Sequence, residues 1–524
     1  MRGWVNDALR FLLGMGIVAL GIWLDVVQRF RIRTYDLAQA RLRIRYRIGP
    51  TTPVLSYGPE LEHNIAARVE VLDERTNFAF TSGSTGAPKR LLYPAERVRR
   101  SRWAFIDAFA RSFVHMPFKR HSFYVFSSLH QDGSLSSLML AEHTRPSYLA
   151  CLQAPDRLQA DPALRGLAER YGDAALRLWV LCLSNPGVLY STNPSTLSAF
   201  LDSLVNDWLD VSALVRDFVE RPGDFSPAVH ALAKRLECRG ARARLRRVAG
   251  RASANELSDI APAVHAYVCW TGGYVQPFLE RLAARLPAPR YRLLPMYSMS
   301  TETPETTPCY RGDEVAFLPL APGVLYEFLA EGSADEGGLL VPARAVKPGG
   351  TYTMVVSDAY GLRRYQTDDL FACTGVVNGL PDLRFLRRRS LSYSFTGEKL
   401  TGEQARLALD RLRTEFEALG AGAYLTLVPS GDGVLPHYWL LRVDSKAADA
   451  APMEVVALRC DALLSELNSE YRAKRASGRL GPMLGASLDR DEFLHQMGGS
   501  QASGSWEAQF KFLPLYTRRW VSGS

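Results

Sequence analysis

Cysteine and histidine are scarce in this 524-residue sequence, and neither forms a recognisable pattern. The seven cysteines are scattered and odd in number, and no two of them form a C-x-x-C pair. This distribution argues against a disulfide scaffold or a zinc site and favours a reducing compartment. The nine histidines show no H-E-x-x-H or comparable ligand spacing. We therefore expect no structural metal.

Nucleic-acid-binding motifs and internal repeats are also missing. The sequence contains no helix-turn-helix, zinc finger or aromatic RNA-binding motif, and no self-similarity at solenoid spacing. The formal charge of +9 and the isoelectric point near 9.2 nevertheless favour an anionic partner. Because nucleic acid is disfavoured, a nucleotide and a membrane surface are the partners left to consider.

What is present is the composition of a folded globular protein. A hydrophobic content of 47% and a charged content of 22% exclude bulk disorder. The length exceeds what one ordinary core needs, so we expect two or three domains.

The first fifty residues differ in kind from the rest. Residues 11–27 are apolar except for Asp25, which makes them just long enough for a membrane-spanning helix. Seven arginines follow between residues 29 and 47, and the positive-inside rule would place the downstream chain in the cytoplasm. A cleaved signal peptide fits poorly. The glycines and Asp25 leave a buried or interfacial helix as the alternative to a spanning one. In residues 41–49, "RLRIRYRIG", charged and apolar residues alternate, which predicts a strand or a membrane-facing surface.

Between residues 95 and 286, apolar runs alternate with helical patterns. We predict a helix over 95–114, directly after Pro94, and a buried strand over 175–184. Pro194 and Ser195 open another helix, and the apolar run in 263–273 ends at glycines before a further helical pattern. This alternation predicts an α/β fold with a mainly parallel sheet, in which nucleotides bind at the carboxyl ends of the strands.

From about residue 315 the pattern changes to strands, and from residue 391 to a separate α+β unit. Strands are predicted at 324–329, 337–343 and 351–358. In the last unit the pattern predicts a helix, two strands and a second helix, at 402–419, 423–429, 437–443 and 453–475. The predicted domains are therefore a hydrophobic N-terminal segment, a large domain and a small, mobile C-terminal domain, at 1–50, 51–390 and 391–524.

The loop "TSGSTGAPK", residues 81–89, admits two interpretations when taken alone. Clusters of Gly, Ser and Thr are common in flexible surface loops. They also form phosphate-binding loops, where glycines let backbone N–H groups approach oxygen atoms and hydroxyls add donors.

Several polar islands follow this loop in a particular order. The segments are "MYSMSTETPE" (296–305), "GLRRYQTDDLF" (361–371), "SYSFTGEKLTGEQ" (392–404) and "AQFKFLP" (508–514). This succession of a lysine-bearing loop, a T-E motif, an R-Y-x-x-x-D motif, a junction and a late lysine is typical of adenylate-forming enzymes. The chain resembles most closely the acyl-acid amido synthetase family, the auxin- and jasmonate-conjugating enzymes and their bacterial relatives. "VVSDAYGLRRYQTDDLF" and "LNSEY" carry that resemblance most specifically.

The resemblance implies an ATP- and Mg²⁺-dependent ligase. A carboxylic acid would attack the α-phosphate of ATP to give an acyl-adenylate and pyrophosphate, and an amine, usually an amino acid, would then displace AMP. The family members imply a monomer in the cytoplasm, to which the segment 11–27 adds the option of attachment to the inner face of the membrane.

The resemblance also assigns roles to individual residues. It implies a catalytic role for Lys511, for Thr301 and for Glu302, which would also hold Mg²⁺. The nucleotide would be bound by Thr81, Ser82, Gly83, Ser84, Thr85, Gly86, Lys89, Thr271, Gly272, Gly273, Tyr365 and Asp369. Lys399 would lie with Glu398 at the pivot of the small domain. The pair Asp368-Asp369 departs from the family pattern, which has Gly before the ribose-binding aspartate.

Two other functions are compatible with the same residues. An acyl-CoA or acyl-carrier ligase shares the first half-reaction, and a membrane-associated binding protein with a decayed site would need no catalysis. The acid pocket is expected near residues 127–153, and the sequence does not specify which acid it accepts.

Overall fold

The computed structural model describes residues 2–69, 77–80, 89–115, 122–126, 135, 162–191, 193–253, 256–272, 275–296, 300–312, 314–331, 339–389, 391–396, 398–419, 424–430, 435–444, 452–498 and 512–520.

A four-stranded parallel sheet in the order β3-β4-β5-β6 organises the first half of the chain. Its strands are β3 (Phe123–Val125), β4 (Val188–Tyr190), β5 (Ala266–Trp270) and β6 (Arg292–Met296). The helices of this part of the chain are α7 (Pro162–Tyr171), α8 (Asp173–Ser184), α9 (Pro194–Asn206), α10 (Trp208–Val211), α11 (Ala213–Glu220), α12 (Pro227–Leu236), α13 (Ala241–Ala249), α14 (Leu257–Ile260) and α15 (Gln276–Arg285), with a 3₁₀ turn at Pro222–Asp224. The predicted α/β fold and parallel sheet are confirmed.

The prediction of a strand at 175–184 is wrong, because this segment is helix α8. All residues from Ala175 to Ser184 are buried, since neighbouring helices surround α8 on every side. An uninterrupted apolar run fits a buried helix as well as a buried strand, so periodicity could not distinguish them. The helix after Pro194 is confirmed, and Asn193 caps it by accepting the Ser195 N–H at 3.0 Å.

A second, antiparallel sheet follows in the order β10-β9-β11-β12-β13. Its strands are β9 (Leu325–Ala330), β10 (Val341–Pro342), β11 (Thr351–Ser357), β12 (Tyr365–Val377) and β13 (Leu380–Arg388), with a 3₁₀ turn at Ala343–Ala345. A short hairpin of β7 (Thr307–Arg311) and β8 (Glu314–Leu318) joins it through Asp382, whose carboxylate accepts the Phe317 N–H at 2.7 Å. This sheet has its own hydrophobic core.

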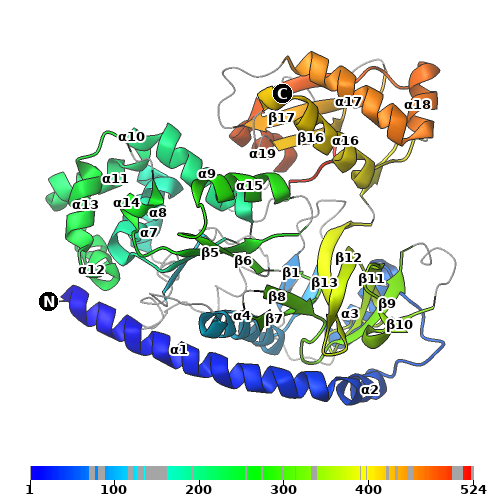
Figure 1. Ribbon diagram of the computed structural model, residues 1–524, viewed down its shortest axis with the longest axis horizontal. Coiled ribbons are helices and arrows are strands. Elements are labelled where there is room, and N and C mark those ends of the chain that lie inside the picture. The colour runs from blue at the N-terminus through cyan, green and yellow to red at the C-terminus, as the bar shows by residue number, and fades with distance from the viewer. Residues whose placement is uncertain are drawn as a thin grey trace.

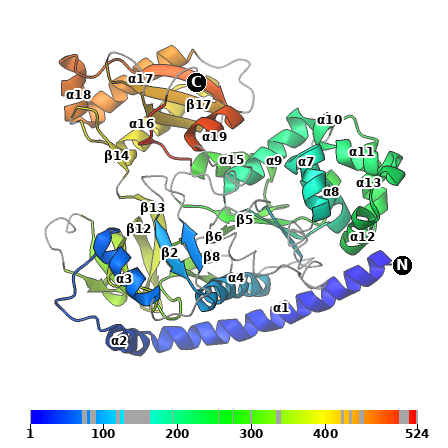
Figure 2. The same cartoon turned by 180° about the vertical axis from the view of Figure 1, so that it is seen from behind.

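The C-terminal unit is a small α+β fold, as predicted for the last part of the chain. The described elements are β14 (Ser392–Tyr393), β15 (Leu400–Thr401), α16 (Gly402–Glu415), a 3₁₀ turn at Glu417–Leu419, β16 (Tyr424–Pro429), β17 (Tyr438–Asp444), α17 (Met453–Leu467), α18 (Ser469–Ala476), β18 (Leu484–Asp489) and α19 (Arg490–Gly498). The predicted second helix is two helices, because Asn468 ends α17 and caps α18 by accepting the Tyr471 N–H at 2.9 Å. Figures 1 and 2 show this unit on one side of the molecule, near α15.

The N-terminal segment forms two helices, α1 (Arg2–Arg33) and α2 (Tyr35–Arg45). The expectation of a strand at 41–49 is wrong, because the first half of this segment belongs to α2. Gln39 and Arg43 lie one helical turn apart and bind β9: Gln39 Oε1 accepts the Tyr326 N–H at 2.8 Å, and Arg43 pairs with Glu327 at 2.9 Å. These tertiary contacts favour a helix over the alternation in the sequence. Within the described part of the chain, one helix, α1, is long and apolar enough to cross a membrane, with 22% of its most apolar stretch buried.

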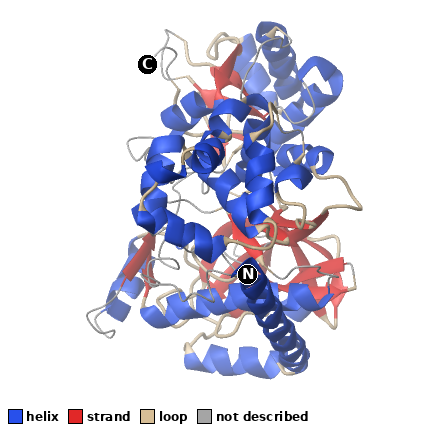
Figure 3. Cartoon of the chain, turned by 90° about the vertical axis from the view of Figure 1, so that its left-hand side faces the viewer, coloured by secondary structure: helices blue, strands red, loops and turns tan. Residues whose placement is uncertain are grey.

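Helix α3 (Pro59–Val69), the hairpin of β1 (Asn77–Phe80) and β2 (Arg90–Tyr93), and helix α4 (Ala95–His115) complete the described elements. The predicted helix after Pro94 is confirmed by α4. In Figure 1, α4 lies between α1 and the two sheets, and α1 runs along the lower edge of the view; Figure 3 shows α1 obliquely, with its N-terminal end toward the viewer.

Candidate functional site

Three of the predicted site residues meet at the ammonium group of Lys89. Its Nζ donates a hydrogen bond to the Tyr365 hydroxyl at 2.9 Å and lies 3.5 Å from Oε1 of Glu302. Lys89 directly precedes β2, Glu302 lies in the loop after β6, and Tyr365 opens β12. The contact therefore joins segments that are more than 200 residues apart in the sequence. Both Glu302 and Tyr365 are buried.

Two aromatic rings flank the same ammonium group. Lys89 Nζ lies 5.6 Å from the ring centre of Tyr365 and 5.9 Å from that of Tyr57. At these distances the ring faces attract a cation. The Tyr57 hydroxyl accepts the Arg90 N–H at 2.9 Å, which fixes the start of β2 beside Lys89. The lysine is therefore held in place before any ligand binds.

The loop carrying Thr301 and Glu302 is held through its backbone. The Tyr93 hydroxyl donates to the Thr301 carbonyl at 2.7 Å, and Nη2 of Arg97 donates to the Glu302 carbonyl at 2.6 Å. Nη1 of Arg97 also donates to the Leu92 carbonyl at 2.6 Å. Burial raises the pKa of Tyr93 to about 12, so this hydroxyl stays a neutral donor at physiological pH. The Glu302 side chain is consequently presented from a fixed backbone.

A buried ion pair extends this support to the second sheet. Arg97 lies 3.0 Å from the carboxylate of Asp358, which follows β11. The same carboxylate accepts the N–H groups of Tyr360 at 2.7 Å and Leu362 at 3.1 Å. Burial raises the pKa of Asp358, while Arg97 and the two N–H groups oppose this effect. The loop that leads into Tyr365 is thereby connected to the loop that carries Glu302.

Asp369 lies opposite Arg388 on the neighbouring strand. Its Oδ1 is 3.5 Å from Nε of Arg388, and the two residues are Cα partners in the β12–β13 hairpin. Asn378 and Gly379 form the hairpin turn, with φ of 51° and 80°. The register shifts twice along the two strands, and the two shifts offset each other, so that 369 pairs with 388 as in a regular hairpin counted from this turn. The register with β11 is irregular between Gln366 and Leu370, as is common where a strand redirects a side chain beside a site.

The comparisons with known proteins identify this second sheet. Residues 317–388, from the end of β8 to the end of β13, match the model of the GH3 family central domain. The match covers these residues alone, and they are called the GH3 central domain below after the model that they match.

Relatives from plants share part of the sequence. The chain is 25% identical over 233 residues to the indole-3-acetic acid-amido synthetase GH3.4 of Arabidopsis thaliana, covering 42% of this chain and 39% of that protein. It is 29% identical over 214 residues to GH3.3 of the same plant, covering 39% and 35%. The chain therefore spans less than half of the length of these relatives.

Solved structures show the same fold over most of the chain. The AtGH3.15 acyl acid amido synthetase in complex with 2,4-DB has a TM-score of 0.65 at 16% identity, covering 89% of this chain and 85% of that one. A second structure of GH3.15 acyl acid amido synthetase has a TM-score of 0.65 at 14% identity, covering 94% and 96%. The predicted fold class, a large α/β part with a smaller α+β unit, agrees with these structures.

Within the GH3 central domain, the turn before Tyr365 depends on two residues with positive φ. Gly361 has a φ of 105°, and a Cβ there would lie 2.9 Å from Cα of Ile65 in α3. Arg364 has a φ of 46° and forms a two-pronged ion pair with Glu327, with both nitrogen–oxygen distances at 2.9 Å. The ion pair of Arg364 therefore helps to fix the backbone directly before Tyr365.

The carboxyl end of β5 also reaches the GH3 central domain. Gly272 follows β5 and packs against β13, where a Cβ would lie 3.1 Å from both Cβ and the carbonyl oxygen of Phe385. Trp270 packs on the same ring, with centroids 5.2 Å apart. Thr271 and Gly272 therefore lie at the junction between the parallel sheet and the GH3 central domain, at the carboxyl end of a parallel strand as predicted.

Glu398 and Lys399 lie at the start of the small unit. Lys399 is exposed and has a φ of 46°. Glu398 is buried and accepts the N–H groups of Phe395 at 2.7 Å and Thr396 at 2.8 Å, and the Tyr438 hydroxyl at 2.7 Å. Burial raises the pKa of Glu398, but these hydrogen bonds outweigh it and leave the pKa below its ordinary value.

Other predicted residues lie outside the described part of the chain. They are Thr81 to Gly86, Gly273 and Lys511, together with the side chain of Asp368 and most of the expected acid pocket at 127–153. The sequence analysis in turn missed Tyr57, Tyr93, Arg97, Asp358 and Arg388. The Asn378-Gly379 turn could have located Arg388, whereas no local pattern predicts the contacts of Arg97.

Proposed function

We propose that the chain is an ATP-dependent acyl-acid amido synthetase. The contact of Lys89 with Glu302 and Tyr365 carries this proposal, because it joins a cation, a carboxylate and an aromatic hydroxyl beside the GH3 central domain. The curated relatives named above are amido synthetases, and this chain covers only part of their length.

The first step would form a mixed anhydride. A carboxylate oxygen of the acid attacks the α-phosphorus of ATP, and the bond to the bridging oxygen of pyrophosphate breaks. Negative charge increases on the α-phosphoryl oxygens, so fixed cations beside them accelerate the step. Lys89 would act as a point charge on the departing phosphates. Lys511 would contribute a second one, and its loss should cost about 10²–10³-fold, as for one strong transition-state donor.

Glu302 is the residue that would hold Mg²⁺. The described residues contain no cluster of three or more His, Cys, Asp or Glu side chains suited to a metal. Mg²⁺ fits such a site because it takes one or two protein carboxylates and completes its coordination with phosphate oxygens and water. The fixed backbone of Thr301 and Glu302 favours this role, and the Thr301 hydroxyl would contact the AMP phosphate.

The remaining residues would bind the nucleotide. Asp369 would accept the ribose hydroxyls, and Tyr365 would pack beside the nucleotide while orienting Lys89. Backbone N–H groups of Thr81 to Gly86 would surround the phosphates. Thr271 to Gly273 would line the adenylate side, where β5 meets the GH3 central domain.

The second step would form an amide. The amine nitrogen attacks the carbonyl carbon of the acyl-adenylate, the carbon–oxygen bond to AMP breaks, and a proton leaves the nitrogen. The change from the first step to the second would involve rotation of the small unit about Lys399, because hinges occur at a few loop positions between rigid units. The exposed position and positive φ of Lys399 suit a pivot.

The experiment is a pyrophosphate-exchange screen over classes of carboxylic acid. We expect exchange that depends on one class of acid and on Mg²⁺. Glu302→Gln and Lys511→Ala should each lower the rate about 10²–10³-fold, whereas Lys347→Ala, at an exposed lysine of the GH3 central domain, should not. Absence of exchange with every class, under conditions where ATP binds, would contradict the proposal and favour a non-catalytic binding protein.

Mass analysis of the products then identifies the second substrate. Incubation with amino acids and with CoA should yield an N-acyl amino acid, and a thioester product would favour the acyl-CoA ligase instead. We also infer a monomer in a reducing, cytoplasmic compartment. The cysteines within the described part of the chain are buried and form no disulfide, which supports this inference.

A further inference from the structure

Between Trp4 and Val26, the N-terminal helix α1 exposes only apolar residues, and polar residues of the same helix face the protein. Asn6, Arg10 and Gln28 are buried against the body of the protein, as are Gly14 and Gly21. Every exposed residue from Trp4 to Val26 is apolar: Trp4, Val5, Ala8, Phe11, Leu12, Met15, Gly16, Ala19, Ile22, Trp23 and Val26. A helix on the surface of a water-soluble domain has the opposite arrangement.

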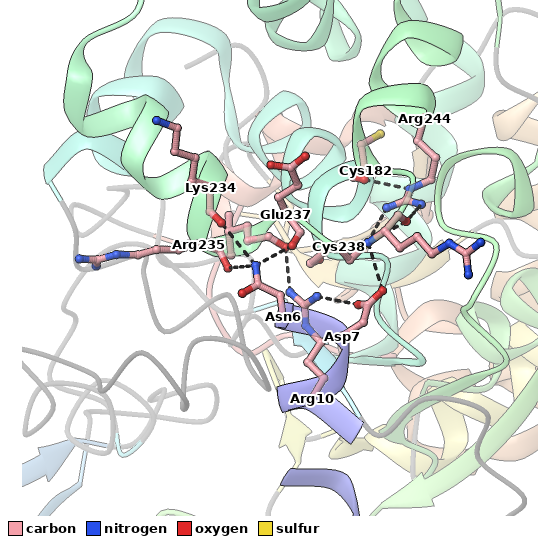
Figure 4. A network of polar contacts seen from close by, with 12 residues as sticks. Asn6, Asp7, Arg10, Cys182, Lys234, Arg235, Glu237, Cys238 and Arg244 are labelled. Carbon is pink, nitrogen blue, oxygen red and sulfur yellow. Dashed lines mark hydrogen bonds and ion pairs between the residues drawn. The ribbon is translucent and has the colours of Figure 1, made fainter. Parts of the chain in front are cut away.

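The inner face is fixed at its N-terminal end by hydrogen bonds to α12 (Figure 4). Nδ2 of Asn6 donates to the Glu237 carbonyl at 2.7 Å, and Nη2 of Arg10 donates to the Leu236 carbonyl at 2.8 Å. Asp7 accepts the Arg239 N–H at 3.1 Å. The last carbonyls of a helix have no partner within the helix, so α1 supplies partners that α12 would otherwise lack.

Further along, α1 packs against α4 and β7. A Cβ at Gly21 would lie 2.1 Å from the Ala110 carbonyl oxygen, so only glycine permits this approach. Asp25 lies 2.5 Å from Nε2 of His115, and Nε2 of Gln28 donates to the Pro308 carbonyl at 3.0 Å. A membrane-spanning α1 would have to break these contacts along its whole length. The helix is therefore built to lie on the protein.

The outer face has the features of a membrane-interface helix. The large side chains Trp4, Phe11, Leu12, Ile22 and Trp23 are 54–64% exposed and follow helical spacing along one side. The apolar stripe runs from Trp4 to Val26, and these 23 residues are about 34 Å long at 1.5 Å per residue. Tryptophan is enriched at the level of lipid headgroups, and here one lies near each end of the stripe. Figures 1 and 2 show α1 as one long helix along the lower edge of the molecule.

Positive charge accompanies the stripe at both of its ends. Arg239 stacks on Trp4 with its guanidinium 3.9 Å from the ring centre. At the other end, exposed arginines follow on α1 and α2, at positions 29, 33, 41 and 45, and Arg47 lies just after α2. Anionic headgroups complement such a pattern, with about 1 kcal/mol of attraction for each basic residue near the surface.

We propose that the outer face of α1 docks flat onto an anionic lipid bilayer, while its inner face stays attached to the protein. The chain is then a peripheral protein that lies on one leaflet and does not cross it. Apolar side chains enter the boundary between headgroups and acyl chains, and the arginines contact the headgroups.

Vesicle flotation of the full-length chain tests this docking. We expect flotation with vesicles of phosphatidylcholine and phosphatidylglycerol, and weaker binding at high salt or with phosphatidylcholine alone. Leu12→Glu should weaken binding about tenfold or more, since it removes one buried leucine side chain from the lipid contact. Leu209→Glu is the matched control, because Leu209 is 66% exposed on α10 and Leu12 is 64% exposed.

A charge variant adds a second comparison. Arg41→Ala with Arg45→Ala should weaken binding to anionic vesicles roughly 25-fold, as two residues at about fivefold each. Arg472→Ala, at an exposed arginine of α18, should leave binding unchanged. Pyrophosphate exchange without vesicles should be the same in all these variants, so failure of docking and failure of the ligase proposal are separately visible.

Depth measurements distinguish flat docking from spanning. Fluorophores at Val5→Cys and Met15→Cys, in a Cys151→Ser background, would be quenched by lipids labelled at known depths. Flat docking predicts equal, shallow depths. A spanning helix would separate the two positions by about 15 Å along its axis, and that result would overturn the proposal. Absence of flotation, or a dimer in lipid-free light scattering that Leu12→Glu dissociates, would overturn it as well.

Discussion

Replacement of Arg97 by alanine should destabilise the protein and disturb the site together. Arg97 and Asp358 are both buried, 3.0 Å apart, and Arg97 also donates to the carbonyls of Leu92 and Glu302. Removing one member of a buried ion pair leaves the other charge unpaired and costs about 3–5 kcal/mol. We therefore expect Arg97→Ala to lower the free energy of unfolding by that amount and to lower kcat, because the Glu302 backbone loses its support.

The loss of stability in Arg97→Ala should be smaller at acidic pH than at neutral pH. The pKa of Asp358 in the folded protein is already raised by burial, and removal of Arg97 raises it further. Between the unfolded pKa and this raised value, the folded state binds more protons than the unfolded state, so folding is stabilised as the pH falls. The deficit of Arg97→Ala should therefore be largest at neutral pH. On acidification it should shrink by up to about 1.4 kcal/mol for each pH unit between the folded pKa of the variant and the lower folded pKa of the parent, because only the variant takes up the proton there.

Urea unfolding at pH 8 and pH 5, followed by tryptophan fluorescence, measures this effect. Arg100→Ala is the matched control, since Arg100 lies on the same helix and forms an exposed pair with Glu96 that should be worth only about 0.3–0.5 kcal/mol. If the alanine variant does not fold, Arg97→Lys can be measured instead, because lysine retains the positive charge but cannot donate to the carbonyls of both Leu92 and Glu302. A deficit below about 1 kcal/mol, or one that is independent of pH, would refute the reasoning.

Three further predictions concern the site and the small unit. Tyr365→Phe removes the hydroxyl that accepts a hydrogen bond from Lys89. We expect a roughly 10- to 150-fold lower pyrophosphate-exchange rate at an unchanged melting temperature, as for loss of one hydrogen bond to a charged group; an unchanged rate would count against the positioning of Lys89. Tyr438→Phe removes a donor from buried Glu398 and should cost about 1.5–3 kcal/mol in urea unfolding at pH 7. Because the pKa of Glu398 is lowered by folding, its stabilisation is present above the unfolded pKa and is lost as the pH falls through the folded pKa. The difference between the variant and the parent should therefore shrink as the pH falls through the folded pKa; a constant difference would contradict this. Phe278 of α15 packs against Tyr424 and Phe512 of the small unit, with ring centroids 6.0 and 5.0 Å apart. Phe278→Ala should therefore broaden the distribution of distances between the large and small units in single-molecule energy transfer. An unaltered distribution would show that this contact does not hold the small unit in place.

The sequence predicted the α/β class, the helix after Pro94, the parallel strand before Thr271 and the small α+β unit, because these elements are encoded by local periodicity and by Pro and Gly signals. The motifs containing Lys89, Glu302 and Tyr365 were recognisable for a related reason. Each is a short run whose residue types suit one chemical task, and the structure confirms that their side chains meet.

The errors occurred where the surroundings outweigh the local pattern. The apolar run at 175–184 fits a strand or a helix, and only its complete enclosure by other helices makes it a helix. The alternation at 41–49 reads as a strand, yet contacts of Gln39 and Arg43 with β9 form helix α2. No periodicity contains that information, because the partners lie about 285 residues away in the sequence.

The same distinction between local sequence patterns and tertiary contacts applies to the site and to α1. The sequence by itself determined that a cation, a T-E motif and an R-Y-x-x-x-D motif are present in order, and that residues 11–27 are apolar. Only the tertiary structure decided that Arg97 fixes the Glu302 backbone and that Asp369 faces Arg388. It also decided that α1 lies along the protein with its apolar side outward, since the orientation of a helix depends on contacts with distant segments that no local pattern specifies.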